Sequence, residues 1–353
     1  MRQPPSPRIQ TQVSMKKGFR ITSSAVLVAL LLSGSPAGAT PRADRVGGPE
    51  SCAECHIQEI EAWKLSAHFR TFNDLHRRPE TAAMLERLGL SRIKHEKQCM
   101  DCHYLNRQEE EGIKSTSGIS CESCHGAGQD WVQTHGDYGK GLTKITESAE
   151  HRRARQQQAI TAGMITPDNL YALGANCYSC HMLSDEKLVN VGGHPSLSEG
   201  FNLLTWSQGE VRHTMLRTDN QANPEASPAH RRRLFVLGVI LETEYGFRAV
   251  ARATEKASFG LTLARRTDAA RKLLEKIQAL APTPELAAII AVAQTTGLRL
   301  NNAAELNAAA EKLSGLGREF AARVTGEQLA GMDALLPTAE QYRGKPYHVN
   351  GAP

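Results

Sequence analysis

The eight cysteines of this sequence form four copies of one pattern, Cys-x-x-Cys-His. The copies are CAECH (Cys52, Cys55, His56), CMDCH (Cys99, Cys102, His103), CESCH (Cys121, Cys124, His125) and CYSCH (Cys177, Cys180, His181). This spacing is typical of covalent attachment of c-type haem. Two cysteines three residues apart lie on one short turn, where both thiols can reach the vinyl groups on one porphyrin edge. The adjacent histidine then becomes the proximal ligand of the iron. The sequence therefore predicts four covalently bound haem c groups.

Zinc binding and disulfide pairing are the alternatives for cysteines with this spacing. Here all eight cysteines belong to a motif, and every motif continues directly into histidine. A disulfide or a zinc site does not require that arrangement four times over. Haem attachment is therefore the interpretation that we favour for all four motifs.

Each haem iron has a second axial position, which one of the nine histidines outside the motifs could fill. His68 lies 12 residues after His56, or about 18 Å along a helix at about 1.5 Å per residue. We therefore expect His68 to ligate a different haem, and the same reasoning applies to His135, ten residues after His125. A third candidate is His194 in Gly-Gly-His-Pro.

His213, in Trp206-Ser-Gln-Gly-Glu-Val-Arg-His213, is a fourth candidate distal ligand that the sequence leaves open. His76, His151 and His230 are expected to be solvated, and His348 lies in the tail. His95, four residues before Cys99, could be a ligand only if the chain loops sharply. Methionine ligation would raise the potential of a haem. However, Met100 and Met182 lie beside attachment cysteines, and no motif supports the other methionines.

The N-terminal residues have the pattern of a secretory leader. A run of eight apolar residues, 25–32, follows Lys16, Lys17 and Arg20 and precedes the small-x-small site at residues 37–39. We expect a signal peptide over residues 1–39, with a possible upstream extension over 1–14, and a mature chain that begins near Thr40. No segment approaches the roughly 18 apolar residues that cross a bilayer. These features predict a periplasmic protein without a transmembrane span.

Removal of the leader changes the charge of the chain. Residues 1–39 hold five basic and no acidic residues, so the formal charge of +5 falls to zero in the mature protein. Residues 40–228 carry 20 basic and 25 acidic residues, a net of −5, and residues 229–353 carry 17 and 12, a net of +5. The basicity of the full sequence therefore gives no support for nucleic-acid binding. The acidic haem-bearing half instead favours a basic redox partner.

Composition divides the mature chain into two parts. Residues 40–228 hold the four motifs, few aromatic residues and several Gly- and Pro-containing turns, which predicts a haem-packed domain with sparse secondary structure. We expect helices there from Ala53 to about Leu75 and near Glu80–Leu88. Residues 229–353 lack cysteine and show helical apolar spacing, which predicts four or five helices over 229–336 and a polar tail from Thr338. The fold class is mainly α, a multihaem cytochrome c fold followed by a C-terminal helical bundle.

The segment from Cys52 to His68 resembles the CxxCH…WxxSxH opening of the cytochrome c-554 family, through Trp63 and Ser66. The segment GISCESCHG at residues 118–126 resembles the same family. The resemblance covers about 50–215 and does not extend to the C-terminal helices. It implies tetrahaem periplasmic carriers related to the haem cores of hydroxylamine oxidoreductase and of other multihaem nitrogen and sulfur enzymes. It also implies that the histidine at position 135 serves the first haem and that the second haem is five-coordinate.

Three functions are compatible with these features. The first is an electron carrier that relays electrons between periplasmic redox proteins through closely packed, mostly bis-histidine haems. The second is an oxidoreductase that acts on a small nitrogen or sulfur compound at one open haem, for which the His103 site is the expected location unless His213 ligates it. The third is a docking subunit of a larger redox complex. We favour the carrier, because no acid–base cluster accompanies a haem motif: Glu122, inside CESCH, is interpreted as a surface or hydrogen-bonding residue. Partners and oligomeric state stay open.

Overall fold

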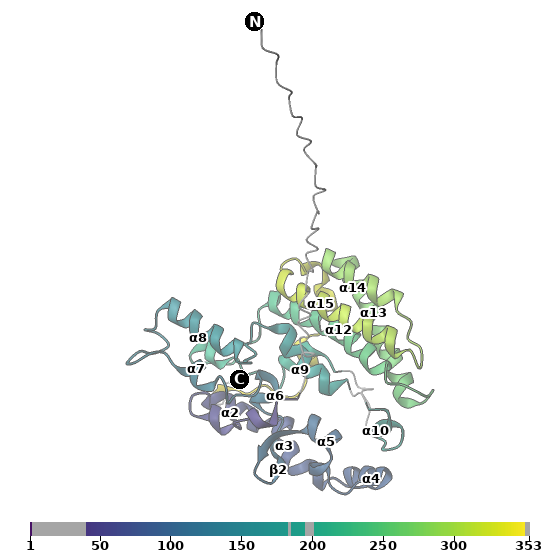
Figure 1. Ribbon diagram of the computed structural model, residues 1–353, viewed down its shortest axis with the longest axis horizontal. Helices are drawn as coiled ribbons and strands as arrows, with labels where there is room; N and C mark the ends of the chain where they lie inside the picture. The colour runs from purple at the N-terminus through teal and green to yellow at the C-terminus, as the bar shows by residue number, and fades with distance from the viewer. Residues whose placement is uncertain (2–39, 183–184, 195–200, 350–353) are drawn as a thin grey trace. The chain divides into compact units, whose positions relative to one another are not determined.

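The computed structural model describes residues 40–182, 185–194 and 201–349 together with Met1, so the expected leader lies outside the described residues except for Met1. The helices are α1 (Glu50–Ala53), α2 (Ile57–Lys64), α3 (Ala67–Asp74), α4 (Pro79–Leu88), α5 (Lys97–His103), α6 (Cys121–His125), α7 (Val132–Gly136), α8 (Ala149–Thr161), α9 (Leu170–His181), α10 (Glu186–Asn190), α11 (Leu203–Ser207), α12 (Pro228–Val250), α13 (Ser258–Leu280), α14 (Pro284–Thr295) and α15 (Ala303–Arg323). Strands β1 (Tyr104–Glu109) and β2 (Gly112–Gly118) form an antiparallel hairpin. The protein is mainly helical, which confirms the predicted fold class (Figure 1).

The helix that the sequence predicts from Ala53 to Leu75 is divided into α1, α2 and α3. Ser66 has extended backbone angles, and its hydroxyl accepts a hydrogen bond from the Phe69 N–H at 3.3 Å, which begins α3. At the end of α2, the indole of Trp63 donates to the Ile119 carbonyl at 2.7 Å. The helix breaks here because the Ser66 cap and the Trp63–Ile119 hydrogen bond together stabilise the interrupted conformation more than one continuous helix would be stabilised. The helix predicted near Glu80–Leu88 is present as α4.

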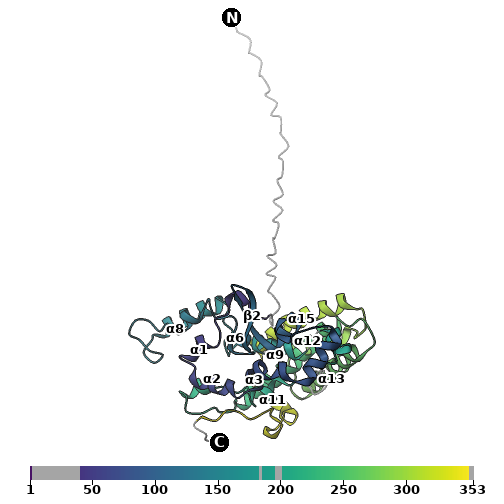
Figure 2. The same cartoon turned by 90° about the horizontal axis from the view of Figure 1, so that it is seen from below.

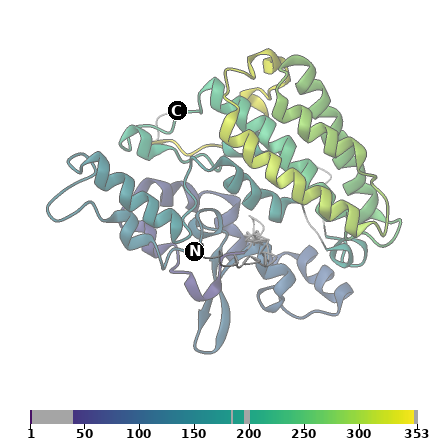
Figure 3. The ribbon, with the colours of Figure 1, turned by 45° about the horizontal axis from the view of Figure 1, so that its top comes forward.

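The C-terminal region contains the predicted bundle, in which α12 is the central helix. It packs against α13 on one side and α15 on another, as Figure 3 shows, and its third neighbour is α9. The predicted stripe of Leu234, Leu237 and Leu241 is buried. Helix α14 begins as predicted, because Thr283 caps it and Pro284 occupies its first turn.

The apolar core continues from this bundle into the haem-bearing region. The predicted boundary at 228/229 coincides with the start of α12, yet Tyr178 and Met182, at the fourth motif, belong to the same core cluster as the bundle residues. The described residues from Thr40 to Val349 group as one unit. The helix that carries the fourth motif is therefore positioned by the bundle.

The C-terminal segment 338–349 returns to the haem-bearing region (Figure 2). The Arg343 N–H donates to the Thr205 carbonyl at 3.0 Å, and the Tyr347 hydroxyl donates to the side-chain carbonyl of Gln58 on α2 at 2.9 Å. The segment that the sequence describes as a polar tail thus packs against the helix that follows the first motif. Within the part of the chain that the structure describes, no helix is long and apolar enough to cross a membrane.

Candidate haem attachment sites

Each Cys-x-x-Cys-His motif lies on a short helical turn. The second and fourth motifs end α5 and α9, the third forms α6, and the first begins in α1 and ends just beyond it. In the first motif the His56 N–H donates to the Cys52 carbonyl at 3.0 Å, which keeps the motif helical after α1 ends. All eight thiols are free of disulfides. The turns therefore present paired thiols with an adjacent imidazole, as thioether attachment requires.

Every motif histidine faces one histidine from elsewhere in the chain. The pairs, with the distances between their ring centroids, are His56 and His135 at 6.2 Å, His103 and His194 at 6.0 Å, His125 and His213 at 6.2 Å, and His181 and His68 at 6.2 Å. The eight histidines that the sequence singles out thus form four pairs, each with one member from a motif.

These separations fit an iron atom between the two rings. An imidazole–metal bond is about 2 Å long, as in zinc sites. Each coordinating nitrogen lies about 1 Å from its own ring centre, so two axial imidazoles on one iron should have centroids about 6 Å apart. All four observed distances agree with that value. The residues present therefore fit four bis-histidine haems.

The pairings differ in part from the expectations. His68 faces the fourth motif rather than the first, as the 12-residue separation from His56 indicates. His135 faces His56, as the resemblance implies. The site expected to lack a distal histidine, that of His103, has His194 opposite it. Spacing alone could not reveal this pair, because 91 residues separate its members and α10 brings them together.

Burial favours the uncharged form of five of the facing imidazoles. Desolvation lowers the pKa of His103 and of His125 to about 4 and that of His181 to about 3. It also lowers the pKa of His68 and of His135. Neutral imidazole is the form that binds a metal, so these histidines are ready to coordinate iron at neutral pH.

The Nδ1 atoms of the paired imidazoles face groups of different kinds. Nδ1 of His125 donates to the Ile165 carbonyl at 2.9 Å, and Nδ1 of His213 donates to the Val211 carbonyl at 2.6 Å. Nδ1 of His56 instead faces the Glu59 carboxylate at 3.8 Å. Both Glu59 oxygens are buried and make no hydrogen bond within the described residues. Such contacts fix the tautomer of an imidazole ligand and change its basicity.

Glu122, between the cysteines of the third motif, is a buried hydrogen-bonding residue. Its side chain accepts the N–H groups of Gly47, Gly48 and Gly128 at 2.9, 2.8 and 2.6 Å, and the residue is 1% exposed. Of the two roles that the sequence leaves open, the hydrogen-bonding one is confirmed and the surface one is wrong. The carboxylate joins the third motif to the segment that leads into the first.

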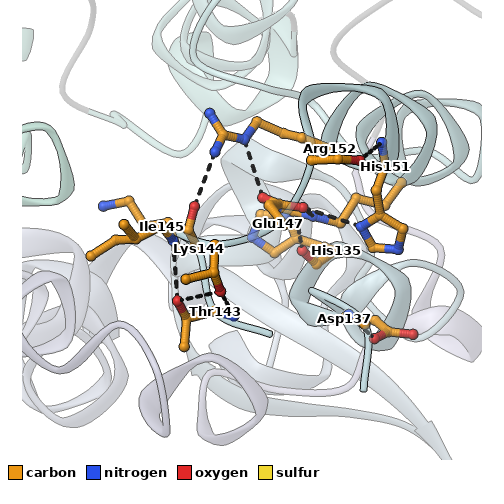
Figure 4. A network of polar contacts seen from close by, with 12 residues as sticks. His135, Asp137, Thr143, Lys144, Ile145, Glu147, His151 and Arg152 are labelled. Atoms are coloured by element: carbon orange, nitrogen blue, oxygen red, sulfur yellow. Dashed lines mark hydrogen bonds and ion pairs between the residues drawn. The ribbon is translucent and has the colours of Figure 1, made fainter. Parts of the chain in front are cut away.

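A buried ion pair supports the segment that carries His135 (Figure 4). The Arg155 guanidinium donates to the His135 carbonyl at 2.6 Å and to both oxygens of Glu147. Arg152 and His151 also donate to this carboxylate, each at 3.2 Å (Figure 4). The hydrogen bonds, that from Arg155 first, lower the pKa of Glu147 to about 2. This network fixes α8 against the His135 backbone.

The attachment turns also contact one another. The thiols of Cys52 and Cys121 lie close enough to shift each other's pKa, and so do those of Cys102 and Cys180. The first site therefore adjoins the third, and the second adjoins the fourth. This proximity is what rapid electron exchange between attached groups requires.

Sequence reasoning missed the aromatic packing around the fourth motif. The Phe201 ring stacks on His181 with centroids 4.3 Å apart, and Trp206 lies 5.8 Å from the same imidazole. Tyr178 meets Phe201 edge to face at 5.0 Å. The only signal in the sequence was the presence of Phe201 and Trp206 five positions apart, and this spacing does not indicate that they pack against His181.

Four attachment turns, each with a second imidazole at iron-bridging distance, are the features of a c-type cytochrome. Residues 51–126 match the family described as Cytochrome c554 and c-prime. Cytochrome c-554 of Nitrosomonas europaea is 27% identical over 136 residues, which cover 36% of this chain and 57% of the relative. No solved structure matches this chain. The comparisons thus show similarity to the cytochrome c554 family over part of this chain, which spans little more than half the length of the curated relative. They support a c-type cytochrome with covalently bound haem c and a role in electron transfer.

Proposed function

We propose that this chain is a periplasmic tetrahaem electron carrier in which eight histidines ligate four haem irons in pairs. The observation that carries the proposal is the set of four histidine pairs with centroids 6.0–6.2 Å apart. Haem c supplies one-electron chemistry through its iron. The chain supplies two thiols and a proximal imidazole at each motif, and a distal imidazole from a remote segment.

The paired imidazoles favour a carrier over an enzyme. A substrate that reacts at a haem iron needs an open axial position, and in this proposal a histidine holds each of the eight positions. His194 supports the carrier most directly, because it faces the one site at which the sequence and the resemblance place an open iron. The acidic balance of residues 40–228 supports a basic redox partner.

The proposal is tested by haem counting and by electron paramagnetic resonance. Purified protein should carry four covalent haems by pyridine haemochrome assay, and all four should be low-spin when oxidised. Replacement of His68, His135, His194 or His213 by Ala should convert one haem to high-spin without loss of covalent haem. His230→Ala is the matched control and should leave all four low-spin. A native high-spin haem that binds carbon monoxide would instead favour the oxidoreductase.

A further inference from the structure

We propose that the C-terminal helices hold the distal ligand of the second haem in place through α10. This inference rests on the proposed function, because it takes His194 as the ligand opposite His103. The segment 186–194 is called the ligand arm below. We infer that its anchors on the α12–α13 connection determine whether small molecules can reach the iron.

The first anchor is Glu186, at the start of the ligand arm. Its carboxylate accepts the Thr254 N–H at 3.0 and 3.1 Å, the Thr254 hydroxyl at 2.6 Å and the Glu255 N–H at 3.3 Å. Thr254 and Glu255 lie in the connection between α12 and α13. A charged acceptor thus joins the arm to the bundle.

The second anchor is Asn190, which supplies α13 with a cap that its own sequence lacks. The residue before α13 is Ala257, which has no side-chain acceptor. The side-chain carbonyl of Asn190 accepts the Phe259 N–H in the first turn of α13 at 2.9 Å, and its amide donates to Glu255 at 3.0 Å. Capping usually comes from the residue that precedes the helix. Here it comes from the arm, so the arm and α13 stabilise each other.

Apolar burial adds to these polar anchors. Leu188 and Val189 are 3% and 6% exposed, and both belong to the core cluster that includes α12 and α13. Helix α10 contacts α13 directly. Because a helix of five residues has little stability of its own in water, the arm depends on this packing for its structure.

The position of His194 follows from the position of α10. The His194 N–H donates to the Leu188 carbonyl at 2.9 Å, and the Gly193 N–H donates to the Val189 carbonyl at 3.1 Å. On the other side, Arg87 of α4 donates to the Gly192 carbonyl at 2.9 Å. The backbone of His194 is thus tied to an element that the bundle holds. If the anchors weaken, His194 leaves the iron more often, and an external ligand can compete for the site.

The test measures carbon monoxide binding to the reduced holoprotein. The double variant Glu186→Gln, Asn190→Ala should bind carbon monoxide at one haem per chain about tenfold faster than the native protein, since loss of a cap changes a local equilibrium by about that factor. Covalent haem content and the other three low-spin signals should not change. The control variant Glu319→Gln, Asn307→Ala makes the same two changes on the exposed face of α15 and should match the native rate.

His194→Ala shows how fast carbon monoxide binds when the second haem has no distal histidine. It also separates the proposal that His194 is a ligand from the proposal that the bundle anchors it. If His194→Ala binds one carbon monoxide but the double variant matches the native rate, the anchoring is wrong and the ligation stands. If His194→Ala leaves the second haem unchanged, both proposals fail at this site. If circular dichroism shows that the double variant folds poorly, the single variant Asn190→Ala replaces it in the test. Carbon monoxide should then bind faster to Asn190→Ala than to the native protein, and an unchanged rate would contradict the inference.

Discussion

The groups that face Nδ1 of His125 and of His56 differ in charge, and this difference bears on the potentials of their haems. Ile165 offers His125 a neutral carbonyl, whereas Glu59 offers His56 a carboxylate with no other described partner. A buried carboxylate makes an imidazole a more electron-donating ligand, which stabilises ferric iron. We therefore expect the first haem to have a lower reduction potential than the third.

Glu59→Gln should raise the potential of the haem attached at His56. The substitution removes a negative charge that faces the His56 imidazole, so the ferric state loses stabilisation. A tenfold change in the one-electron equilibrium corresponds to 59 mV, and we expect a shift of about that size in one component of a spectroelectrochemical titration. Glu61→Gln, at an exposed position of the same helix, is the control. Four unchanged components would contradict the role of Glu59.

Glu122→Gln should destabilise the folded protein by about 3 kcal/mol, because three N–H groups lose a charged acceptor in a buried site. Chemical denaturation of the holoprotein measures this loss. Glu54→Gln changes a glutamate between the cysteines of the first motif that is exposed, and it should change stability by less than about 0.5 kcal/mol. Equal effects in the two variants would show that the amide contacts contribute little.

At the level of single residues, the sequence predicts which residues attach each haem better than it predicts which distal histidine faces each motif histidine. The motif itself specifies which thiols and which imidazole serve one haem, because these groups share one turn. The pairing of His125 with His213 depends on segments 88 residues apart, and no local pattern encodes it. Glu59 also escaped notice, since an acidic residue in a surface helix normally faces solvent.

At the level of elements, the α7–α8 connection makes stability depend on pH through Glu147. Its pKa of about 2 lies below the ordinary glutamate value near 4.5. A carboxylate whose pKa is lower in the folded than in the unfolded state stabilises the folded state at any pH above its unfolded-state pKa. This stabilisation is lost as the pH falls toward the folded-state pKa. The relevant window is therefore about pH 4.5 to 2.

Glu147→Gln should lower the melting temperature at neutral pH and flatten its dependence on pH within that window. The native and variant curves should converge as the pH approaches 2, where native Glu147 also becomes protonated. Thermal unfolding at several pH values measures both effects. Glu150→Gln, at an exposed position in the first turn of α8, is the control. A constant difference between native and Glu147→Gln proteins across the window would contradict the assignment.

Helices with strong local signals were predictable, and breaks set by distant contacts were not. Helix α14 begins where the Thr-Pro pair indicates, because both residues act locally. The break at Ser66 depends partly on the bond from Trp63 to Ile119, which lies 56 residues away. The sequence therefore predicted one long helix across this break.

At the scale of the whole molecule, the C-terminal segment 338–349 contacts the helix that follows the first haem motif. Gly209 lies against the Arg343 carbonyl so closely that a side chain there would collide with it. Gly209→Ala should therefore displace the segment and expose the bond after Arg343 to trypsin. Limited proteolysis should show faster cleavage there than in the native protein. Gly315→Ala, where a Cβ meets nothing within 4 Å, is the control. Equal cleavage rates in Gly209→Ala and native protein would contradict this tethering.

The contacts between thiols of different motifs have a consequence for how the cytochrome is assembled. In an oxidising compartment, a chain that folds before it receives its cofactors brings Cys52 next to Cys121 and Cys102 next to Cys180. Each pair can then form a disulfide that blocks two attachment motifs at once. We expect peptide mass spectrometry of chain made without haem to reveal these two cross-links in preference to bridges within motifs. We therefore expect productive assembly to require that thioether formation precede compaction of the chain.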